Sequence, residues 1–250
     1  MRILYVFPHP DDESFGPARA ISAQVRAGHD VHLLTLTRGG ATKVRFDLGL
    51  SVEEMGAVRY AEMREMARVL ELSGLTVLDF PDGGLKALDP RVLEAVVADH
   101  IETVRPAVVV TYPVHGVSGF HDHLVTHAVV KRAFVELRDR DDAAPTRLAF
   151  FTLTEDQAER ASGVHRLSGS TSAEIDCLVT AGEEDMETFR RALDAYVSYR
   201  KTIERTGVRT SLGRTVAFEF YGESFDPPVS DLCTGIARGE YKEETPQMRR

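Results

Sequence analysis

Short apolar runs alternate with helical patterns through the first 150 residues of the chain. Four runs are rich in β-branched and aromatic side chains and are typical of strands buried on both faces: residues 3–7, 31–36, 75–80 and 107–112. Amphipathic helical patterns follow them at residues 18–27, 51–72, 90–105 and about 122–138. This alternation predicts an α/β fold with a mainly parallel sheet, helices on both faces and right-handed crossovers.

The pattern is weaker beyond residue 147. It predicts strands at residues 148–153 and 175–179, a loop at 161–172 and a helix from 186 to about 206. We therefore expect a single domain over residues 1–237, with a core at 1–150 and a less regular C-terminal lobe at 151–237. Residues 238–250 are polar and charged, and we expect a disordered tail there.

Composition excludes several kinds of partner. The chain has 39 acidic and 30 basic residues and a formal charge of -9, which opposes binding to a phosphate backbone. No apolar stretch approaches the roughly 18 to 20 residues of a membrane span, so we expect a cytoplasmic protein that binds neither nucleic acid nor membrane. A homo-oligomer stays possible. The two cysteines have no metal-site spacing, so any metal must use histidine and carboxylate.

Polar residues follow each of the four predicted strands. The first strand leads into Pro-His-Pro-Asp-Asp-Glu at residues 8–13, the second into Arg38 and two glycines, the third to Asp82, and the fourth to His121, Asp122 and His123. The carboxyl ends of parallel strands open at one edge of a sheet, where ligands bind in α/β folds. We therefore expect these side chains to converge.

His9, Asp12 and His123 could hold one divalent metal. Two histidines and one carboxylate are a frequent ligand set for catalytic zinc, which keeps a position for water. Asp11 would then be free to act as a base. A simpler interpretation is that Asp12, Glu13 or Asp122 only caps a helix. The sequence pattern gives no role to Arg59 or His165, and it favours a packing role for His127, which lies one helical turn after His123.

The motif at residues 8–13 resembles the signature of the LmbE-like, or PIG-L, family of N-acetylglucosaminyl deacetylases. Supporting segments follow in order at residues 37–40, 80–83 and 116–123, with Arg59 between the first two. The resemblance implies a Rossmann-like fold and one zinc ion, with another divalent metal possible, on His9, Asp12 and His123. It also implies that Asp11 is the base and that Arg59 and Asp82 hold the sugar.

One position departs from the family pattern. The family usually has Gly-His-Pro-Asp-His, where the first histidine assists the reaction, and this chain has Gly-Phe-His-Asp-His at residues 119–123. Phe120 therefore occupies the place of the assisting histidine. We expect His121 to take over by a shift of one residue; the alternative is that this assistance is lost.

The sequence thus predicts a zinc-dependent hydrolase that removes an N-acetyl or N-acyl group from an amino sugar or glucosamine conjugate. Two alternatives stay open at this point. A site with two histidines and one carboxylate also occurs in non-haem iron oxygenases. Phe120 also leaves open a catalytically silent member of the same fold that only binds the sugar.

Overall fold

The computed structural model describes residues 1–138, 140, 145–163 and 165–237. The disorder predicted for residues 238–250 lies outside the described residues.

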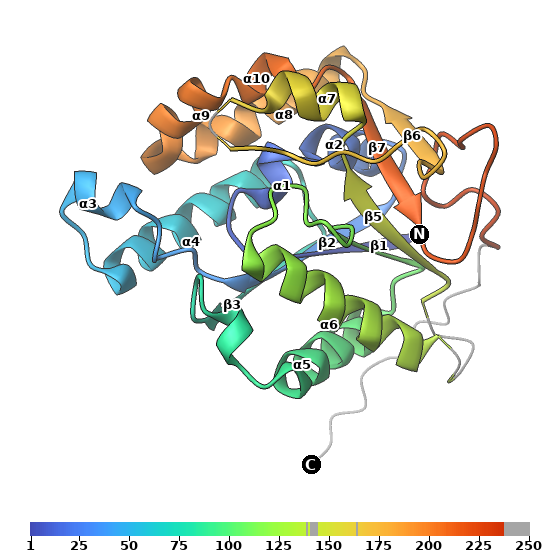
Figure 1. Cartoon of the computed structure of the whole chain (residues 1–250), viewed down its shortest axis with the longest axis horizontal. Coiled ribbons are helices and arrows are strands. Elements are labelled where there is room, and N and C mark those ends of the chain that lie inside the picture. Colours follow the sequence, from blue (N-terminus) through green and yellow to red (C-terminus); the bar gives the residue numbers. More distant parts are fainter. Residues whose placement is uncertain (139, 141–144, 164, 238–250) are drawn as a thin grey trace.

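Seven strands form one sheet in the order β3-β2-β1-β4-β5-β7-β6 (Figure 1). The strands are β1 (Arg2–Phe7), β2 (Asp30–Thr37), β3 (Gly74–Phe80), β4 (Val108–Thr111), β5 (Arg147–Thr152), β6 (Cys177–Thr180) and β7 (Thr215–Phe220). The pairs among β1 to β5 are all parallel, whereas β7 is antiparallel to both β5 and β6. The predicted, mainly parallel α/β sheet is confirmed, and β1 and β4 are neighbours at the point where the strand order reverses.

Helices lie on both faces of the sheet. They are α1 (Asp12–Phe15), α2 (Ala18–Arg26), α3 (Val44–Leu48), α4 (Val52–Val69), η1 (Leu85–Ala87), α5 (Pro90–Val104), α6 (His121–Leu137), α7 (Glu155–Ala161), α8 (Glu183–Ala195), η2 (Val197–Tyr199), α9 (Arg200–Thr206) and α10 (Val208–Ser211). Helices α2, α4 and α8 pack together on one face, and α5 and α6 pack together on the other (Figure 1).

Alternate residues of β1 enter two separate hydrophobic cores. Ile3, Tyr5 and Phe7 belong to the core beneath α2, α4 and α8, whereas Leu4 and Val6 belong to the core beneath α5 and α6. All five side chains are fully buried. Because successive side chains of a strand point to opposite faces, a continuous apolar run is what a central strand requires.

The second half of the chain differs from the sequence prediction in β7, in the helix after residue 186 and in the short helices α7 and α10, for which the sequence predicts no element. The apolar alternation of β7 had not been predicted as a strand, yet β7 lies between β5 and β6 in the same sheet. The helix predicted from 186 to about 206 is interrupted at Tyr196, whose ψ of 67° is not helical, so α8 ends at Ala195. The reason for this break lies in the site described below.

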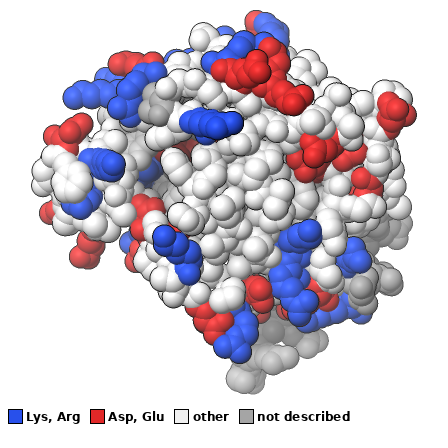
Figure 2. Space-filling model, viewed as in Figure 1, with Lys and Arg blue, Asp and Glu red and all other residues white. Residues whose placement is uncertain are grey.

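Charged side chains lie mostly at the margin of the face shown in Figure 2, and uncharged residues occupy its middle. Acidic and basic groups are mixed along that margin. Within the described part of the chain, no helix combines the length and apolar character needed to cross a bilayer.

The C-terminal segment after β7 is fixed to the sheet by a buried arginine. The Arg147 side chain is 3% exposed, forms a 2.6 Å ion pair with Glu223 and donates to the carbonyl of Thr234 at 3.0 Å. It also donates to the carbonyl of Leu232. One guanidinium thus satisfies acceptors along about a dozen residues of irregular chain.

We expect Arg147→Met to lower the free energy of unfolding by about 2 kcal/mol, because it leaves a half-buried carboxylate and two carbonyls without their donor. Urea unfolding followed by circular dichroism measures this. The control is Arg132→Met, because Arg132 is 55% exposed and pairs with Glu136 on the surface of α6. That change should cost less than about 0.5 kcal/mol. Equal losses in the two variants would contradict the role given to Arg147.

Candidate active site

The turn after β1 brings the first three polar side chains of the motif into the site. Asp11 has a left-handed φ of 83°, and its carbonyl accepts from the amides of Ser14 and Phe15 to start α1. Asp12 then turns back towards His9, whose backbone N–H donates to Asp12 Oδ2 at 2.9 Å. Neither Asp11 nor Asp12 caps α1 through its side chain. The capping interpretation of Asp12 is therefore wrong, and its carboxylate points into the site.

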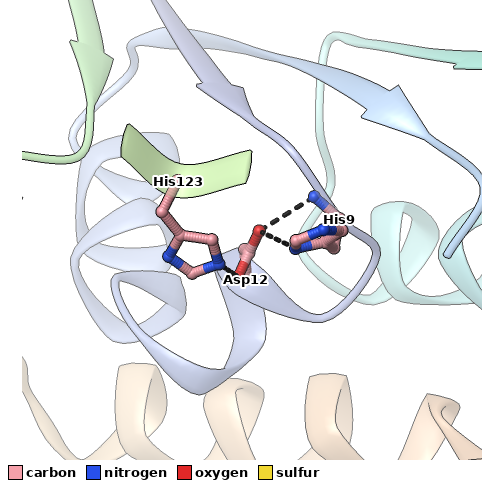
Figure 3. A group of neighbouring side chains, drawn as sticks. All are labelled: His9, Asp12 and His123. Carbon is pink, nitrogen blue, oxygen red and sulfur yellow. Dashed lines mark hydrogen bonds and ion pairs between the residues drawn. The ribbon is translucent and has the colours of Figure 1, made fainter. Parts of the chain in front are cut away.

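His9, Asp12 and His123 come together around one point (Figure 3). His9 Nδ1 lies 3.5 Å from Asp12 Oδ2, and His123 Nε2 lies 3.4 Å from Asp12 Oδ1. One ligand atom from each residue lies within 4.8 Å of the others. Asp12 is 6% exposed and His123 is 5% exposed. The sequence predicted this convergence, because β1 and β4 end side by side at the same edge.

In each imidazole, the outer nitrogen faces away from Asp12 and the inner nitrogen faces it. A hydrogen bond to the outer nitrogen orients the inner one. His123 Nδ1 lies 2.9 Å from the carbonyl of Gly116, and His9 Nε2 lies 3.3 Å from carboxylate oxygens of both Asp122 and Asp82. Acceptors at these positions keep the outer nitrogens protonated, so His9 Nδ1 and His123 Nε2 are the nitrogens that face Asp12 and can bind a cation. Outer hydrogen bonds of this kind orient histidine ligands in metal sites.

Asp122 connects the loop after β3 to the start of α6. Its carboxylate accepts from the backbone N–H groups of Gly83 at 2.8 Å and Leu85 at 3.2 Å. It makes no cap of α6, whose N-cap is Phe120. Asp122 therefore fixes a neighbouring loop and supports His9, in place of the capping role that the sequence left open.

The charges of the site favour a cation. Burial disfavours the charged form of His9, but Asp12 and Asp122 outweigh this and raise the His9 pKa to about 10. Burial opposes ionisation of Asp12, whereas His123 and His9 lower its pKa. Two imidazole nitrogens and a carboxylate oxygen fit zinc or another divalent first-row metal with an open position. The residues present therefore suit the predicted metal.

Tyr112 is a member of the site that the sequence analysis missed. Its hydroxyl donates to Asp12 Oδ1 at 2.8 Å, and its ring stacks on His123 with a centroid distance of 4.2 Å. Tyr112 closes the most strongly β-forming run of the chain, so its residue type predicted only the end of a strand. It orients one candidate ligand by hydrogen bonding and another by packing.

Asp11 is held by Arg59 from α4. Arg59 Nη2 donates to Asp11 Oδ2 at 2.6 Å and to the Pro10 carbonyl at 2.7 Å, and the guanidinium lies 3.9 Å from the centre of the Tyr199 ring. Arg59 is 2% exposed, so it is not the solvated helix residue that its pattern suggested. Burial raises the pKa of Asp11 to about 6, against the lowering effect of Arg59.

Tyr196 explains why the predicted C-terminal helix breaks. Its hydroxyl accepts from the backbone N–H of Asp11 at 3.0 Å and donates to Glu13 Oε1 at 2.8 Å. Tyr196 is fully buried. The non-helical turn at this residue ends α8 where its side chain enters the site.

The paired glycines after β2 allow the second loop to pack against the first. A Cβ atom on Gly39, whose φ is +63°, would lie 2.8 Å from Pro10 Cδ, and one on Gly40 would lie 2.2 Å from the Val52 carbonyl oxygen. Asp82 accepts from the Ala41 amide at 2.7 Å, which joins this loop to the loop after β3. Larger residues at either glycine would separate the loops.

The remaining predicted residues lie around the mouth of the site. His121 is the exposed first residue of α6, and Phe120 is 46% exposed with its ring edge-on to His123 at 5.6 Å. His165 lies 5.3 Å from Phe120 on the other side, so a residue given no role by the sequence borders the site. His127 Nδ1 donates a hydrogen bond to the Tyr112 carbonyl at 2.9 Å, which is a structural role.

These side chains border a cavity of about 740 Å³ at the carboxyl edge of the sheet. His9, Asp11, Asp12, Arg59, Asp82, His121 and His123 all line it. Every residue predicted for metal binding, catalysis or substrate binding therefore faces the same space. The arrangement can hold a metal ion next to a carboxylate that is oriented by an arginine.

A family model described as PIG-L: GlcNAc-PI de-N-acetylase matches residues 4–134. A curated relative from Kineococcus radiotolerans, named 1D-myo-inositol 2-acetamido-2-deoxy-alpha-D-glucopyranoside deacetylase, is 33% identical over 164 residues. That alignment covers 54% of this chain and 45% of the relative. The chain spans about half the length of the curated relatives it matches.

Solved structures share the fold at low sequence identity. The N,N'-diacetylchitobiose deacetylase of Pyrococcus horikoshii superposes with a TM-score of 0.61 at 16% identity, covering 88% of this chain and 83% of the other. GalB, the 4-carboxy-2-hydroxymuconate hydratase of Pseudomonas putida, gives 0.66 at 12% identity, covering 89% and 96%. Because the fold is common to a deacetylase and a hydratase, the chemistry must be argued from the site.

We expect His123→Ala to weaken Zn²⁺ binding by at least about 100-fold, since it removes a candidate ligand and its hydrogen-bonded support. Calorimetric titration of the metal-free protein measures the affinity. His127→Ala is the matched control, one helical turn further along α6 and outside the metal cluster. It should bind Zn²⁺ as the unchanged protein does. Unchanged affinity in His123→Ala would contradict the proposed ligand set.

Proposed function

The chain belongs to the PIG-L family, and we propose that it is a zinc-dependent amide hydrolase that removes an N-acetyl group from an amino sugar or glucosamine conjugate. The observation that carries this proposal is the position of Asp11. Its carboxylate lies beside His9, Asp12 and His123 in one cavity, where a base and a metal can act on the same amide.

The cation would be held by His9 Nδ1, His123 Nε2 and the Asp12 carboxylate. Zinc in such a site supplies a water of lowered pKa and polarises the carbonyl of the amide. The contacts of Asp122, Asp82 and Gly116 to the outer imidazole nitrogens keep both histidines in the tautomer that binding requires.

Asp11 is the proposed general base. It accepts the proton of the attacking water, and the water oxygen bonds to the carbonyl carbon. Arg59 engages Asp11 Oδ2, so we propose that it acts through Asp11 as a positioning residue. The resemblance implied that Arg59 holds the sugar; its burial and its bond to Asp11 favour the positioning role.

The carbon–nitrogen bond then breaks, and the nitrogen receives a proton. We propose that His121 stabilises the oxyanion or delivers this proton, because it is the exposed imidazole beside Phe120 at the cavity mouth. The products are acetate and a free amine.

Asp82 is the proposed sugar-binding residue. Its carboxylate lines the cavity on the His9 side, where it can accept from sugar hydroxyl groups. The relative from Kineococcus radiotolerans is named as a deacetylase of an acetamido sugar linked to inositol, which supports the same class of substrate here.

The decisive experiment combines metal analysis of the purified protein with an amine-release assay over several N-acetylated glucosamine conjugates. Release of amine and acetate in equal amounts, dependent on bound metal, is expected. Turnover that requires oxygen and a cosubstrate would indicate an iron oxygenase instead. Binding of a conjugate without release would indicate a catalytically silent sugar-binding protein.

We expect Asp11→Asn to lower kcat by about 1,000-fold while the metal content stays unchanged, because the amide cannot accept the proton of water. Steady-state kinetics and metal analysis on the same preparation measure both. Asp156→Asn is the control, since the Asp156 side chain is 72% exposed on α7. Wild-type turnover in Asp11→Asn would show that another group is the base.

For His121→Ala we expect kcat to fall about 100-fold with KM changed only a few-fold, because His121 is proposed to act in the transition state. Adding Phe120→His to this variant should restore part of the lost kcat by returning a histidine to the family's usual position. If His121→Ala alone keeps full kcat, the shift by one residue is wrong and the assistance comes from elsewhere.

A further inference from the structure

The walls of the cavity change in character along the carboxyl edge of the sheet. The strand order places the Asp82 loop after β3 at one end, the candidate metal ligands after β1 and β4 in the middle, and the end of β5 on the other side. Strands lie about 4.8 Å apart, so β3 and β5 are separated by about 20 Å. The cavity spans this distance and is lined by residues from all five strands or the loops after them.

The end beside β3 is polar. Asp82, Thr42 and Lys43 line the cavity there, and Tyr199 donates its hydroxyl proton to Thr42. The opposite end is mostly apolar, with a wall formed by Phe15, Phe151, Leu153, Leu167, Val208 and Leu212, although Thr202, Arg205, Thr206 and Ser211 of α9 and α10 also line the cavity. We call this second end the apolar chamber.

The apolar chamber begins next to the metal ligands. The ring of Phe151 lies 6.1 Å from that of Tyr112, which itself stacks on His123. The Phe151 ring also occupies the space that a side chain at residue 16 would need, because a Cβ atom on Gly16 would lie 2.5 Å from the ring. The ring of Tyr112 therefore separates Phe151, in the chamber wall, from the candidate metal ligand His123.

Hydrogen bonds hold the chamber wall together. Gln157 of α7 is 6% exposed, and its amide donates to the carbonyls of Leu212 and Thr215 at 2.9 Å each. The Ser168 amide donates to the Val117 carbonyl at 2.7 Å, which fixes the loop bearing Leu167. Figure 1 shows α7, α9 and α10 lying together on the α8 side of the sheet. The chamber is thus a built part of the fold.

An amide held at the metal carries two substituents, the acyl chain and the sugar, which point in opposite directions. Sugar hydroxyl groups need the polar end, so the acyl group must point towards β5. An acetyl group offers a single methyl to this wall and leaves most of its apolar surface without a ligand. The whole cavity, polar end included, measures about 740 Å³, within the range of about 300–1,000 Å³ for ligand pockets, and the six apolar side chains of the chamber offer more surface than one methyl can cover.

We propose that the apolar chamber binds the acyl chain of the substrate, and that the enzyme prefers N-acyl amino sugars with a linear chain longer than acetyl. This inference rests on the proposed hydrolase function. The reaction is the same hydrolysis, and its products are a fatty acid and the free amine.

The test is a series of N-acyl glucosamine substrates with acetyl, butyryl, hexanoyl and octanoyl chains. Burial of each methylene is worth about 0.8 kcal/mol, so kcat/KM should rise about fourfold per methylene until the chamber is full. Octyl N-acetylglucosaminide carries the same apolar length on the opposite side of the amide. A gain with this glycoside and none with the N-acyl series would overturn the proposal.

Val208→Phe fills the chamber and should bring the hexanoyl-to-acetyl ratio of kcat/KM down to about one. The matched control is Val92→Phe, because Val92 is 51% exposed on α5, outside the cavity. It should leave the ratio unchanged. An unchanged ratio in Val208→Phe would mean that the chain binds elsewhere.

A binding measurement separates failure of this proposal from failure of the hydrolase function. Calorimetry on the Asp11→Asn protein compares the affinity for N-hexanoyl- and N-acetylglucosamine without turnover. Tighter binding of the longer chain with no hydrolysis in the unchanged protein would overturn the hydrolase function and keep the chamber. Hydrolysis of the acetyl substrate with no gain from longer chains, in either binding or kcat/KM, would overturn the chamber alone.

Discussion

The carboxylate of Asp12 is the group on which the whole site depends. It accepts from the His9 backbone and the Tyr112 hydroxyl, and it faces the inner nitrogens of both His9 and His123. A carboxylate that is 6% exposed costs much free energy unless positive charge and hydrogen bonds balance it. His9, whose pKa is raised to about 10, supplies positive charge, whereas burial lowers the pKa of His123. A divalent cation between the three residues can supply this charge in place of the His9 proton. The arrangement is therefore organised for a cation before one binds.

The sequence could predict the convergence of His9, Asp12 and His123 because it follows from chain order alone. Parallel strands joined by helices end at one edge, so the loops after them must meet there. The supporting contacts could not be predicted in this way. Asp11 lies 48 residues from Arg59 and 185 from Tyr196, and neither partner has a local signal of its role. Helical pattern describes only which face of α4 is buried, and the face bearing Arg59 is buried against the site.

The C-terminal half shows where tertiary contacts override local pattern. Helical spacing continues through Tyr196, yet the backbone leaves the helix there and the hydroxyl reaches Asp11 and Glu13. These two hydrogen bonds, one buried and one partly buried, compensate for the lost helical geometry. The strand β7 is a different case, because its alternation is visible but its partners are not. Pairing with β5 and β6 comes from residues far apart in the chain, which a single sequence does not reveal.

Phe120 and the apolar chamber both bear on how a substrate would lie in the cavity. Phe120 is the N-cap of α6 and has extended backbone angles, whereas His121 is the first helical residue, so the two side chains leave the backbone at different places and do not occupy the same direction. Phe120 instead lies edge-on to His123 and against His165, which adds apolar surface on the His123 side of the cavity. His121 is exposed at the cavity mouth, so the assistance proposed for it would reach the amide from that side. That geometry suits the proposed substrate, whose acyl chain would lie in the apolar chamber and whose sugar would lie at the polar end beside Asp82.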